Sequence, residues 1–551
     1  MPKKFIPRSL SFIFPAFSLF ASFAAFSLDC GAAARTFYID SKAGNDANDG
    51  QAKATAFKSL KQAHALKFQP GDRILLKRGC EFTGKLELNG ASGTKESPIV
   101  IDAYGKGNLP LIDSKGYIAA VYILNSSFID VSNLEIISDG GKIVDKRAKK
   151  ERFGLLVEAN GGDSKNINIR KLKVHNIFSN ESKPHEGAKS TTNTGIGIGC
   201  YICKEGGTME NLLVEDCQIS MTGYLGLRLK GTKNNKLKNS KILNNKTYKT
   251  GGTGLLFSIC SGVLVKGNET NFSGSDADPR MHARGSGSWT WTCDNILYEN
   301  NRFLNAKGRG DSCGIHIDFN CSDIVIQRCL SYNNAGGFIE ILGNNKNCSY
   351  RYNISINDGY RERRKNGATQ DGKVFWLSSF CGKNGTKQGP YNSYIYNNTI
   401  FVKKEILTKF STPDTVKGIL IVNNIFHVLG PTKNVSGDQP WKKKKKKVKA
   451  PQEIENVVFK NNIYTKETTL PADFLLQDLE KIIADPKYKN PGGTKPEDYI
   501  PTNVDVIKDK GIEIEKLPED DIGLKVGLKV EKDFFGNPIK GKPDMGAIEI
   551  P

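Results

Sequence analysis

Two neighbouring stretches of the chain carry acidic side chains at positions where they could act together as a general acid and a base. The first, DSCGIHIDFN, begins at Asp311, and the second, GGFIEILGNN, begins at Gly336. In both, apolar residues alternate with polar residues or glycine, which is typical of a strand with one buried face. We therefore expect His316, Asp318 and Glu340 on the outer face of two adjacent strands.

The spacing of the two stretches predicts how these side chains meet. Similar lines begin at Asp323 and Asn347, and the interval of 24 residues also separates His316 from Glu340. Glu340 should therefore lie beside His316, with Asp318 two residues further along the same face. With about 4.8 Å between strands and about 6.8 Å for two residues along a strand, the backbones of Asp318 and Glu340 would lie about 8 Å apart. Carboxyl groups that flank a glycosidic bond have separations in this range.

Hydrolysis of a glycosidic bond needs one carboxyl group that is protonated and another that is ionised. We assign the acid role to Glu340, because Phe338 and Leu342 should face outward beside it. Burial against apolar neighbours raises the pKa of a carboxyl group. Asp318 is then the nucleophile, or the base that activates water.

Two further residues complete the candidate catalytic group. The imidazole of His316 can hydrogen-bond either carboxyl group and hold it in position. Asp311, at the entry to the strand, is a third acidic candidate. No metal site is expected, because Cys200 and Cys203 form a lone CxxC without a second pair at zinc-finger spacing.

Basic and aromatic residues on both sides of the acidic pair are suited to holding a sugar. Guanidinium groups grip carboxylates or sulfates in bidentate fashion, and aromatic side chains offer flat faces for stacking. The residues expected to bind substrate are Arg280, His282, Arg284, Trp289, Trp291, Arg361, Arg363, Arg364, Lys365 and Trp376.

The elements that position these residues are copies of one short line. In each copy an apolar stretch alternates with polar residues, an Asn or Cys follows, and a β-branched residue closes the unit, as in FIDVSNLEI from Phe128 and GILIVNNIF from Gly418. The copies recur at intervals of 23 to 46 residues, which signals a solenoid whose units bury their apolar faces by stacking. The strand alternation predicts an all-β protein, a right-handed parallel β-helix solenoid.

The seventh position of each copy forms a column of polar residues. Stacked side chains of this kind can hydrogen-bond up and down the coil at a bend. The column is expected to contain Cys217, Asn268, Asn301, Cys329, Asn353, Thr399, Asn424 and Asn462.

The composition indicates an exported protein. Residues 1–34 combine basic residues, an apolar run and small residues before Arg35, which predicts a secretory signal and a secreted or periplasmic protein, with no membrane association after cleavage. The formal net charge of +21 favours an acidic polysaccharide over nucleic acid as the partner of an exported protein. The basic clusters at 142–152 and at Lys442–Lys449 are expected to be solvated. The odd number of cysteines left after cleavage argues against a disulfide framework.

The flanking segments resemble those of secreted right-handed parallel β-helix proteins of the pectin-lyase-like, carbohydrate-active kind. The resemblance rests on FYIDSKAGNDANDG from Phe37, GDRILLKRG from Gly71, and DFFGNPIKGKPDMGAIE from Asp533. It implies that a short helix over 56–68 covers the first coil. We divide the chain into the signal at 1–34, a cap with the first coils at 35–110, the β-helix with the catalytic face at 111–470, and a closing segment at 471–551. We expect it to be a monomer.

The site also resembles that of β-helical glycoside hydrolases, including a xylosidase family. The resemblance lies in the DxxGxxxD spacing from Asp311 to Asp318, followed by Glu340 one coil later. It implies that Asp318 and Glu340 are the catalytic carboxyl groups. The predicted function is a secreted glycoside hydrolase that cleaves an acidic polysaccharide, sulfated or containing uronate, without a cofactor.

Two other functions remain open at this stage. The first is a polysaccharide lyase, which needs a base and a cation that neutralises the uronate carboxylate. Its candidate bases are Arg284, His282, Lys365 and His316, and its candidate calcium ligands are Asp311, Asp318 and Glu340. The second is a β-helix that binds glycan without cleaving it.

Overall fold

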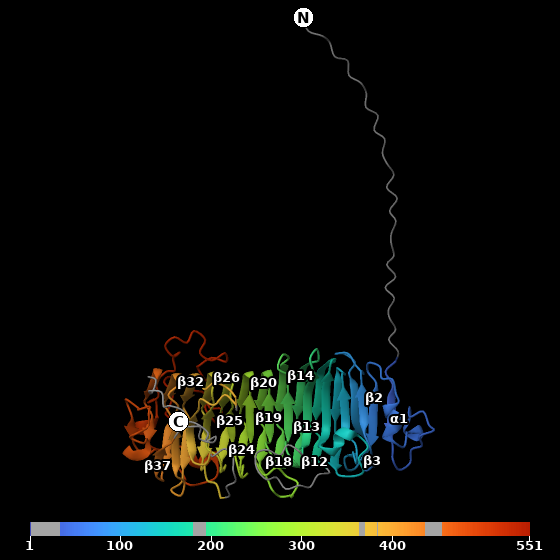
Figure 1. The fold of residues 1–551 in the computed structure, drawn as a ribbon, viewed down its shortest axis with the longest axis horizontal. Coiled ribbons are helices and arrows are strands. Elements are labelled where there is room, and N and C mark those ends of the chain that lie inside the picture. The colour runs from blue at the N-terminus through green and yellow to red at the C-terminus, as the bar shows by residue number, and fades with distance from the viewer. Residues whose placement is uncertain (2–32, 180–193, 363–369, 383, 436–453) are drawn as a thin grey trace. The chain divides into compact units, whose positions relative to one another are not determined.

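The chain coils around three long parallel β-sheets whose strands stack along one axis (Figure 1). The computed structural model describes Met1 and residues 33–179, 194–362, 370–382, 384–435 and 454–551. In this part of the chain each full coil adds a strand to each sheet in turn, and consecutive coils pair in parallel, as β23 and β26 do. The predicted all-β class and the parallel β-helix are confirmed.

Sheet A has 14 strands in the described residues. They are β1 (Thr36–Ile39), β2 (Arg73–Lys77), β5 (Ile99–Tyr104), β8 (Ile129–Ser132), β11 (Asp163–Arg170), β14 (Thr208–Glu215), β17 (Leu237–Leu243), β20 (Cys260–Lys266), β23 (Asp294–Glu299), β26 (Ser322–Gln327), β29 (Lys346–Arg351), β32 (Tyr391–Tyr396), β35 (Lys417–Val422) and β38 (Glu455–Lys460).

Sheet B, also with 14 described strands, follows sheet A in each coil. Its strands are β3 (Glu81–Thr83), β6 (Leu111–Asp113), β9 (Glu135–Asp139), β12 (Lys173–Phe178), β15 (Gln218–Thr222), β18 (Lys246–Thr250), β21 (Glu269–Asn271), β24 (Arg302–Leu304), β27 (Leu330–Tyr332), β30 (Ile354–Ile356), β33 (Thr399–Val402), β36 (Ile425–Val428), β39 (Ile463–Tyr464) and β40 (Ile482–Ile483).

Sheet C has 12 described strands and carries the candidate site. Its strands are β4 (Leu86–Asn89), β7 (Ala119–Leu124), β10 (Glu151–Asn160), β13 (Thr194–Lys204), β16 (Leu227–Lys230), β19 (Leu255–Ser258), β22 (Ser288–Trp291), β25 (Ile315–Ile317), β28 (Ile339–Ile341), β31 (Lys373–Leu377), β34 (Thr408–Ser411) and β37 (Thr432–Asn434).

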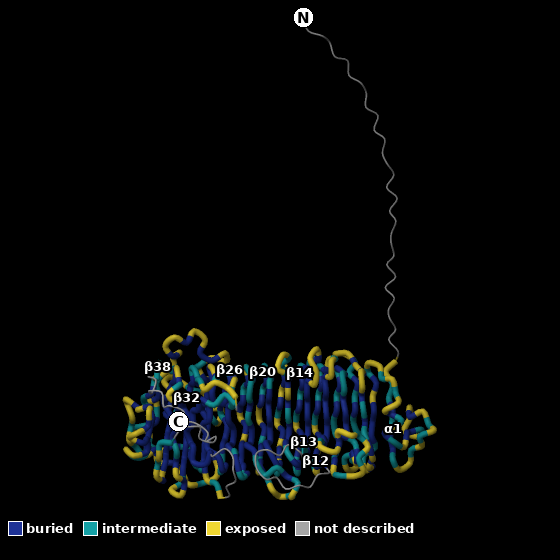
Figure 2. Tube along the Cα trace, viewed as in Figure 1, coloured by how far each residue is buried: buried dark blue, intermediate teal, exposed yellow. Residues whose placement is uncertain are grey.

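The interior of the solenoid is filled by the inward-facing residues of all three sheets, and the loops between strands hold most of the exposed residues (Figure 2). On β25, for example, Ile315 and Ile317 join the apolar core. This placement leaves the alternate residue of the same strand, His316, for the outer face.

The expected polar column forms a continuous ladder at the corner between sheets A and B. Asn268 donates from its backbone and its side chain to Oδ1 of Asn301, at 2.9 and 3.0 Å, and its Nδ2 donates to a carbonyl of the preceding coil. The same pattern recurs at the other Asn positions. The ladder residues are Cys217, Asn245, Asn268, Asn301, Cys329, Asn353, Asn398, Asn424 and Asn462.

One member of the column was wrong. Asn398, not Thr399, hydrogen-bonds both Asn353 and Asn424. The reason is the register between β29 and β32, in which Tyr350 pairs with Ile395, one residue earlier than the sequence alignment assumed. Thr399 instead begins the next strand of sheet B.

The backbone conformation explains why Asn begins many copies of the repeat. Asn166, Asn211, Asn295, Asn347 and Asn456 have φ between 53° and 57°. Asn tolerates this left-handed region better than other residues with a Cβ, since its short polar side chain can hydrogen-bond locally. These residues bend the chain within the first half of β11, β14, β23, β29 and β38 of sheet A.

The N-terminal helix is shorter than predicted. α1 spans Leu60–His64, because Phe57 pairs with the first strand by hydrogen bonds between its backbone and that of Tyr38 and Asp40, so the helix begins only after Ser59. Leu60 and Ala63 are buried against the first coils. The other short helices are the 3-10 turns Lys53–Thr55, Lys146–Lys149, Glu467–Thr469 and Pro496–Tyr499, and α2 (Val504–Ile507).

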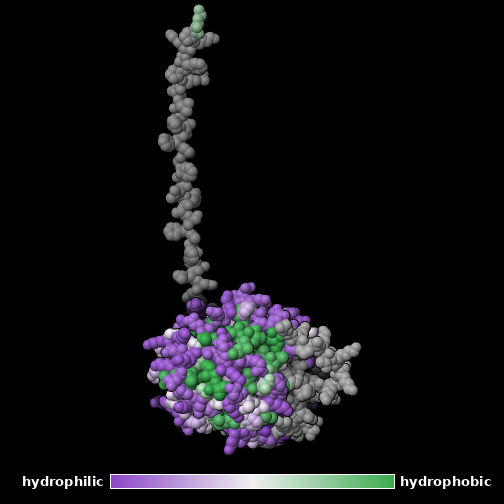
Figure 3. Space-filling model, turned by 90° about the vertical axis from the view of Figure 1, so that its left-hand side faces the viewer, coloured by the Kyte–Doolittle hydropathy of each residue, from purple (hydrophilic) through white to green (hydrophobic). Residues whose placement is uncertain are grey.

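The closing segment packs on the outer face of the C-terminal part of sheet A, from β23 to β38. Leu517, Leu524 and Val530 pack on outward-facing aromatic residues such as Tyr394. Asp520 accepts hydrogen bonds from Tyr394 and Asn347. In the part of the chain that the structure describes, these apolar contacts lie on sheet A and not on the strands of sheet C that carry the candidate site. The C-terminal end of the solenoid shows apolar patches between hydrophilic residues (Figure 3), and exposed apolar side chains of the closing segment include Leu479.

The basic cluster at 142–152 is exposed as expected at Lys142, Lys146, Arg147, Lys149 and Lys150, and Arg152 is the exception. The side chain of Arg152 is fully buried and donates hydrogen bonds to the carbonyl groups of Lys115, Tyr117 and Gly140. Residues 2–32 of the predicted signal and the run Lys442–Lys449 lie outside the described residues. Within the described ranges, the chain has no helix with the length and apolar character that crossing a membrane requires.

Candidate active site

The register predicted for the two acidic stretches is present in sheet C. Ile317 on β25 pairs with Ile341 on β28, so His316 and Glu340 are neighbours on the outer face. The row continues on either side, because Trp289 pairs with His316 and Glu340 pairs with Trp376. The outer face of four adjacent strands therefore presents an indole, an imidazole, a carboxyl group and a second indole in line.

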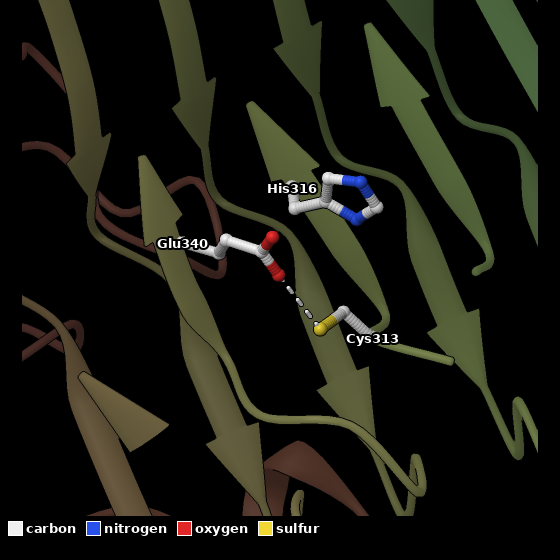
Figure 4. Close-up of side chains that lie close together, drawn as sticks. All are labelled: Cys313, His316 and Glu340. Atoms are coloured by element: carbon white, nitrogen blue, oxygen red, sulfur yellow. Dashed lines mark hydrogen bonds between the residues drawn. The ribbon is translucent and has the colours of Figure 1, made fainter. Parts of the chain in front are cut away.

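Glu340 is enclosed by hydrogen-bond donors. Nε2 of Gln370 donates to both carboxyl oxygens, at 3.1 and 3.0 Å, and Sγ of Cys313 donates to Oε2 at 3.2 Å (Figure 4). Only 1% of Glu340 is exposed. Burial, reinforced by the negative charges of Asp318 and Asp311, raises the pKa of Glu340 to about 8. Glu340 is therefore protonated at neutral pH.

The neighbours that bury Glu340 differ from those expected. Phe338 does not face outward, since it belongs to the interior core and packs edge-on against Tyr350 at 5.6 Å between ring centroids. The reason is that β28 begins only at Ile339, so strand alternation does not extend back to residue 338. Gln370 and Cys313, which actually enclose Glu340, come from a loop and from the entry to β25.

Asp318 lies just beyond the end of β25 and is half-buried. Its Oδ1 accepts a hydrogen bond from the backbone N–H of Phe319 at 2.9 Å. Burial and the charge of Asp311 outweigh this hydrogen bond and raise the pKa of Asp318 to about 7. Asp318 therefore holds a proton in much of the population near neutral pH, which differs from the ionised state that a base requires.

Asp311 is the ionised carboxyl group of the site. Arg284 grips it in bidentate fashion, with Nε donating to Oδ2 at 2.7 Å and Nη2 donating to Oδ1 at 2.9 Å. Burial opposes ionisation, but the charge and the hydrogen bonds of Arg284 prevail and lower the pKa of Asp311. Arg361 anchors the same turn by donating to the backbone carbonyl of Asp311.

The turn that presents Asp311 is strained. Asp311 and Ser312 have φ of 52° and 68°, two consecutive left-handed residues other than glycine. Each such residue costs on the order of 1 kcal/mol or more and persists only where the surroundings fix it. Ser312 supports the turn by donating to the carbonyl of Gly310 at 2.9 Å. Strain of this kind clusters at functional sites, which favours a role for Asp311.

His316 is neutral and stacked. Its ring lies parallel to that of Trp289, with 5.6 Å between centroids and 11° between planes, and its Nδ1 lies 3.3 Å from Oγ of Ser286. Burial lowers the pKa of His316 to about 4, against the opposing charge of Asp311. In the described residues the hydrogen bond of the ring goes to Ser286, not to a carboxyl group as predicted.

Cys313, His316 and Glu340 bring possible metal-ligand atoms within 4.8 Å of one another (Figure 4). A thiolate, an imidazole and a carboxylate suit a soft divalent metal such as zinc. However, burial and the charge of Glu340 raise the pKa of Cys313, so its thiol keeps the proton that it donates to Glu340. This group of three does not include Asp311 or Asp318, which were candidate calcium ligands together with Glu340.

The arginines predicted to grip substrate bind the protein itself. Arg280 forms ion pairs with Asp278 and Asp139, and Arg284 pairs with Asp311. Arg361 donates to backbone carbonyls and lies 3.7 Å from the carboxyl group of Asp371. Arg363, Arg364 and Lys365 lie outside the described residues.

The predicted aromatic residues differ in exposure. Trp289 and Trp291 are half-buried on the outer face of sheet C, next to an apolar cluster that includes Tyr201 and Leu256. Trp376 is only 1% exposed, and Nζ of Lys373 lies 3.6 Å from its ring centroid. His282 packs edge-on against Tyr224 at 4.9 Å. Trp289 and Trp291 are thus the indoles with surface available to a sugar.

Sequence reasoning missed several residues of the site. Gln370, Lys373 and Ser286 stand in segments without a repeat signal. Gln370 and Ser286 approach Glu340 and His316 from loops, and Lys373 begins β31, the strand that pairs with β28. Cys313 was within reach of prediction, because it lies between Asp311 and His316 in the stretch already singled out.

The fold and site define a parallel β-helix protein with clustered carboxyl groups on the outer face of one sheet. No protein-family model matches the chain. The chain is similar to a lacto-N-biosidase of Bifidobacterium longum subsp. longum, with 24% identity over an alignment 621 residues long, which includes 93% of this chain. It spans about a third, 36%, of the length of that curated relative.

Crystal structures of the GH136 lacto-N-biosidase from Eubacterium ramulus are also similar to this chain. The selenomethionine derivative has a TM-score of 0.51 and 22% identity, over 73% of this chain and 67% of that chain. The native protein has a TM-score of 0.50 and 21% identity, over 73% and 68% of the two chains. At this identity the likeness shows that the parallel β-helix fold is shared.

Proposed function

We propose that the chain is a glycoside hydrolase in which Asp318 is the general acid and Asp311 is the ionised nucleophile or base. The similarity to a lacto-N-biosidase over 93% of the chain supports the reaction class. The observation that carries the roles is the opposite displacement of two pKa values: the pKa of Asp311 is lowered, whereas that of Asp318 is raised to about 7. Acid and base roles are recognised by such a divergence.

The sequence-based pair of Asp318 and Glu340 fits this requirement less well. Both residues have raised pKa values, about 7 and about 8, so near neutral pH neither is a reliable base. Glu340 is also 1% exposed and already hydrogen-bonded by Gln370 and Cys313. We propose that Glu340 acts indirectly, as a protonated residue that fixes the packing beside His316.

The chemistry follows from these protonation states. Asp318 donates its proton to the oxygen of the leaving sugar, while the carboxylate of Asp311 either attacks the anomeric carbon or removes a proton from an attacking water. Arg284 keeps Asp311 ionised in the buried turn. The stacked rings of Trp289 and His316 supply a flat, uncharged surface for a sugar ring next to the carboxyl groups.

The substrate is proposed to be a glycan that carries negative charge. The arginines predicted to recognise that charge are bound to the protein's own groups, so the support comes from the formal net charge of +21 and from other cations on sheet C. The alternatives are elimination from a uronate and binding without cleavage.

Product analysis tests the proposal. The full chain is incubated with a neutral lacto-N-biose-capped oligosaccharide and with sulfated and uronate-containing polysaccharides. If the chain is a hydrolase of charged glycans, we expect new reducing ends from a charged polysaccharide. These products should lack the ultraviolet absorbance of an unsaturated uronate. Unsaturated products would identify a lyase instead, and the absence of any product with retained binding would identify a binding protein.

A further inference from the structure

A cleft lies on sheet C, towards the N-terminal end of the solenoid from the candidate active site. Its lining includes Arg147, Glu158, Tyr201, Arg228, Lys230 and Lys233. Glu158 pairs with Tyr201, and Tyr201 pairs with Lys230, across β10, β13 and β16. Arg228 precedes Lys230 by two residues on β16, so both cationic side chains leave the same face of the strand.

Two carboxyl groups, Glu151 and Glu158, also line the cleft, and both lie beside Arg147, which is 3.9 Å from Glu151. Arg147 grips Glu158 in bidentate fashion, with distances of 2.9 and 2.7 Å, and the hydroxyl of Tyr122 donates to the same carboxylate at 2.5 Å. Although burial opposes ionisation, these hydrogen bonds keep the pKa of Glu158 below its ordinary value. Because both of its oxygens are already bound by Arg147, Glu158 does not neutralise another cation of the cleft.

Arg228 and Lys230 have no such partner. Among the described residues, neither forms an ion pair with a carboxylate, and the buried Nε of Arg228 has no hydrogen-bond partner. Both lie over the ring of Tyr201, with Cζ of Arg228 at 5.5 Å and Nζ of Lys230 at 5.9 Å from its centroid. Burial and the charge of Arg228 lower the pKa of Lys230. The charge of Glu151 offsets this effect only in part, so an anion in the cleft would relieve the remaining repulsion between the two cations.

A straight row of side chains leads from this cleft to the candidate active site. Arg228 pairs with Leu256, Leu256 with Trp289, and Trp289 with His316. Three strand spacings separate Arg228 from His316, which corresponds to about 14 Å. A glycan that lies across sheet C with its scissile bond at Asp318 can therefore place another sugar unit in the cleft.

We propose that this cleft is a subsite for a glycan unit that bears an oxyanion, either a carboxylate or a sulfate ester. The guanidinium of Arg228 and the ammonium of Lys230 bind the oxyanion, and the ring of Tyr201 and its neighbours form the wall beside the sugar. This inference deepens the proposed function, on which it rests for the presence of a glycan on this face of sheet C.

Calorimetric titration of the full chain with three oligosaccharides of equal length tests the subsite. Chondroitin sulfate carries uronate and sulfate, hyaluronan carries uronate alone, and a chitin oligosaccharide is neutral. Arg228→Gln is expected to weaken binding of a charged oligosaccharide about tenfold or more, as the loss of a charge-assisted hydrogen bond predicts. It should leave binding of the neutral one within about twofold. If Arg228→Gln weakens binding of hyaluronan, a carboxylate is sufficient for recognition by the subsite. If it weakens binding of chondroitin sulfate alone, the subsite recognises sulfate.

The matched control is Arg302→Gln, which removes the same charge from an exposed ion pair with Glu269 on sheet B. This variant should bind all three oligosaccharides as the wild type does. Equal weakening by the two variants, or equal weakening of charged and neutral ligands, would overturn the subsite. Because binding is measured and not turnover, a chain that cleaves no glycan but still shows the Arg228 effect would contradict only the hydrolase. If the chain cleaves glycan but Arg228→Gln leaves its binding of the charged oligosaccharides unchanged, only the subsite is contradicted.

Discussion

The carboxylate of Asp311, at the entry to β25, raises the pKa of Asp318, which lies just beyond the end of the same strand. Arg284 holds Asp311 ionised, and the resulting negative charge, added to burial, raises the pKa of Asp318 to about 7. One stretch of eight residues thus supplies both an ionised and a protonated acid, with the short strand β25 between them.

The pH dependence of activity should reflect this pair. We expect kcat/KM to fall above about pH 7, as Asp318 loses its proton, and to persist well into the acid range, because the pKa of Asp311 is lowered. Arg284→Gln should move the acid limb to higher pH, since Asp311 loses the cation that keeps it ionised. A rate profile measured from pH 3 to 9 on both proteins checks this. An acid limb that stays in place in the variant would contradict it.

The pH dependence of stability should report Glu340. Its pKa is about 8 in the folded chain and ordinarily 4.5, so the folded state keeps a proton that the unfolded state loses between these values. Its contribution is fully present below about pH 4.5 and is lost as pH rises to about 8, by at most about 1.4 kcal/mol for each pH unit.

Glu340→Gln removes this titration and preserves the shape of the protonated side chain. The free energy of unfolding of the variant, relative to the wild type, should therefore rise steadily between pH 5 and 8 in denaturant titrations. His316, whose pKa is lowered to about 4, contributes the opposite slope between about pH 4 and 6.5 in both proteins, so the comparison cancels it. A constant difference across this range would show that Glu340 is not protonated in the fold.

The asparagine ladder should be a major source of stability. Asn301→Ala leaves the buried backbone N–H of Asn268 and the carbonyl of Val265 without their partners. At about 1 to 3 kcal/mol for each unsatisfied group, the loss should be on the order of 3 kcal/mol. Chemical denaturation measures it. The exposed Asn108 provides the control, since Asn108→Ala should change stability by less than about 0.5 kcal/mol. Equal effects of the two changes would refute the ladder's role.

The fold could be predicted from the sequence because its determinants are local and repeated. Each copy carries its own strand alternation and corner residues, so the pairing of His316 with Glu340 followed from one interval. The same reasoning failed at Thr399, where the SYIYNNTIF copy is displaced by one residue, and at the N-terminal helix, which a backbone pairing of Phe57 shortens.

The protonation states of the site were less accessible to prediction. Alternation identified Asp318 and Glu340 as outward-facing, but not the partners that set their pKa values. Gln370 reaches Glu340 from a loop 30 residues away in the chain, and Arg284 reaches Asp311 from 27 residues before it. Neither contact follows from the sequence repeat. The assignment of acid and base roles to the carboxyl groups therefore required the structure.

The central claim is that Asp311 and Asp318, not Glu340, carry the acid–base chemistry. The most direct test is kcat/KM of Asp311→Asn, Asp318→Asn and Glu340→Gln on one glycan that the wild type cleaves, with folding checked by circular dichroism. We predict that the two Asp variants lose on the order of 10³-fold or more, whereas Glu340→Gln stays within about tenfold of the wild type. A folded Asp318→Asn variant with activity near that of the wild type, or a loss in Glu340→Gln as large as in Asp318→Asn, would contradict the account.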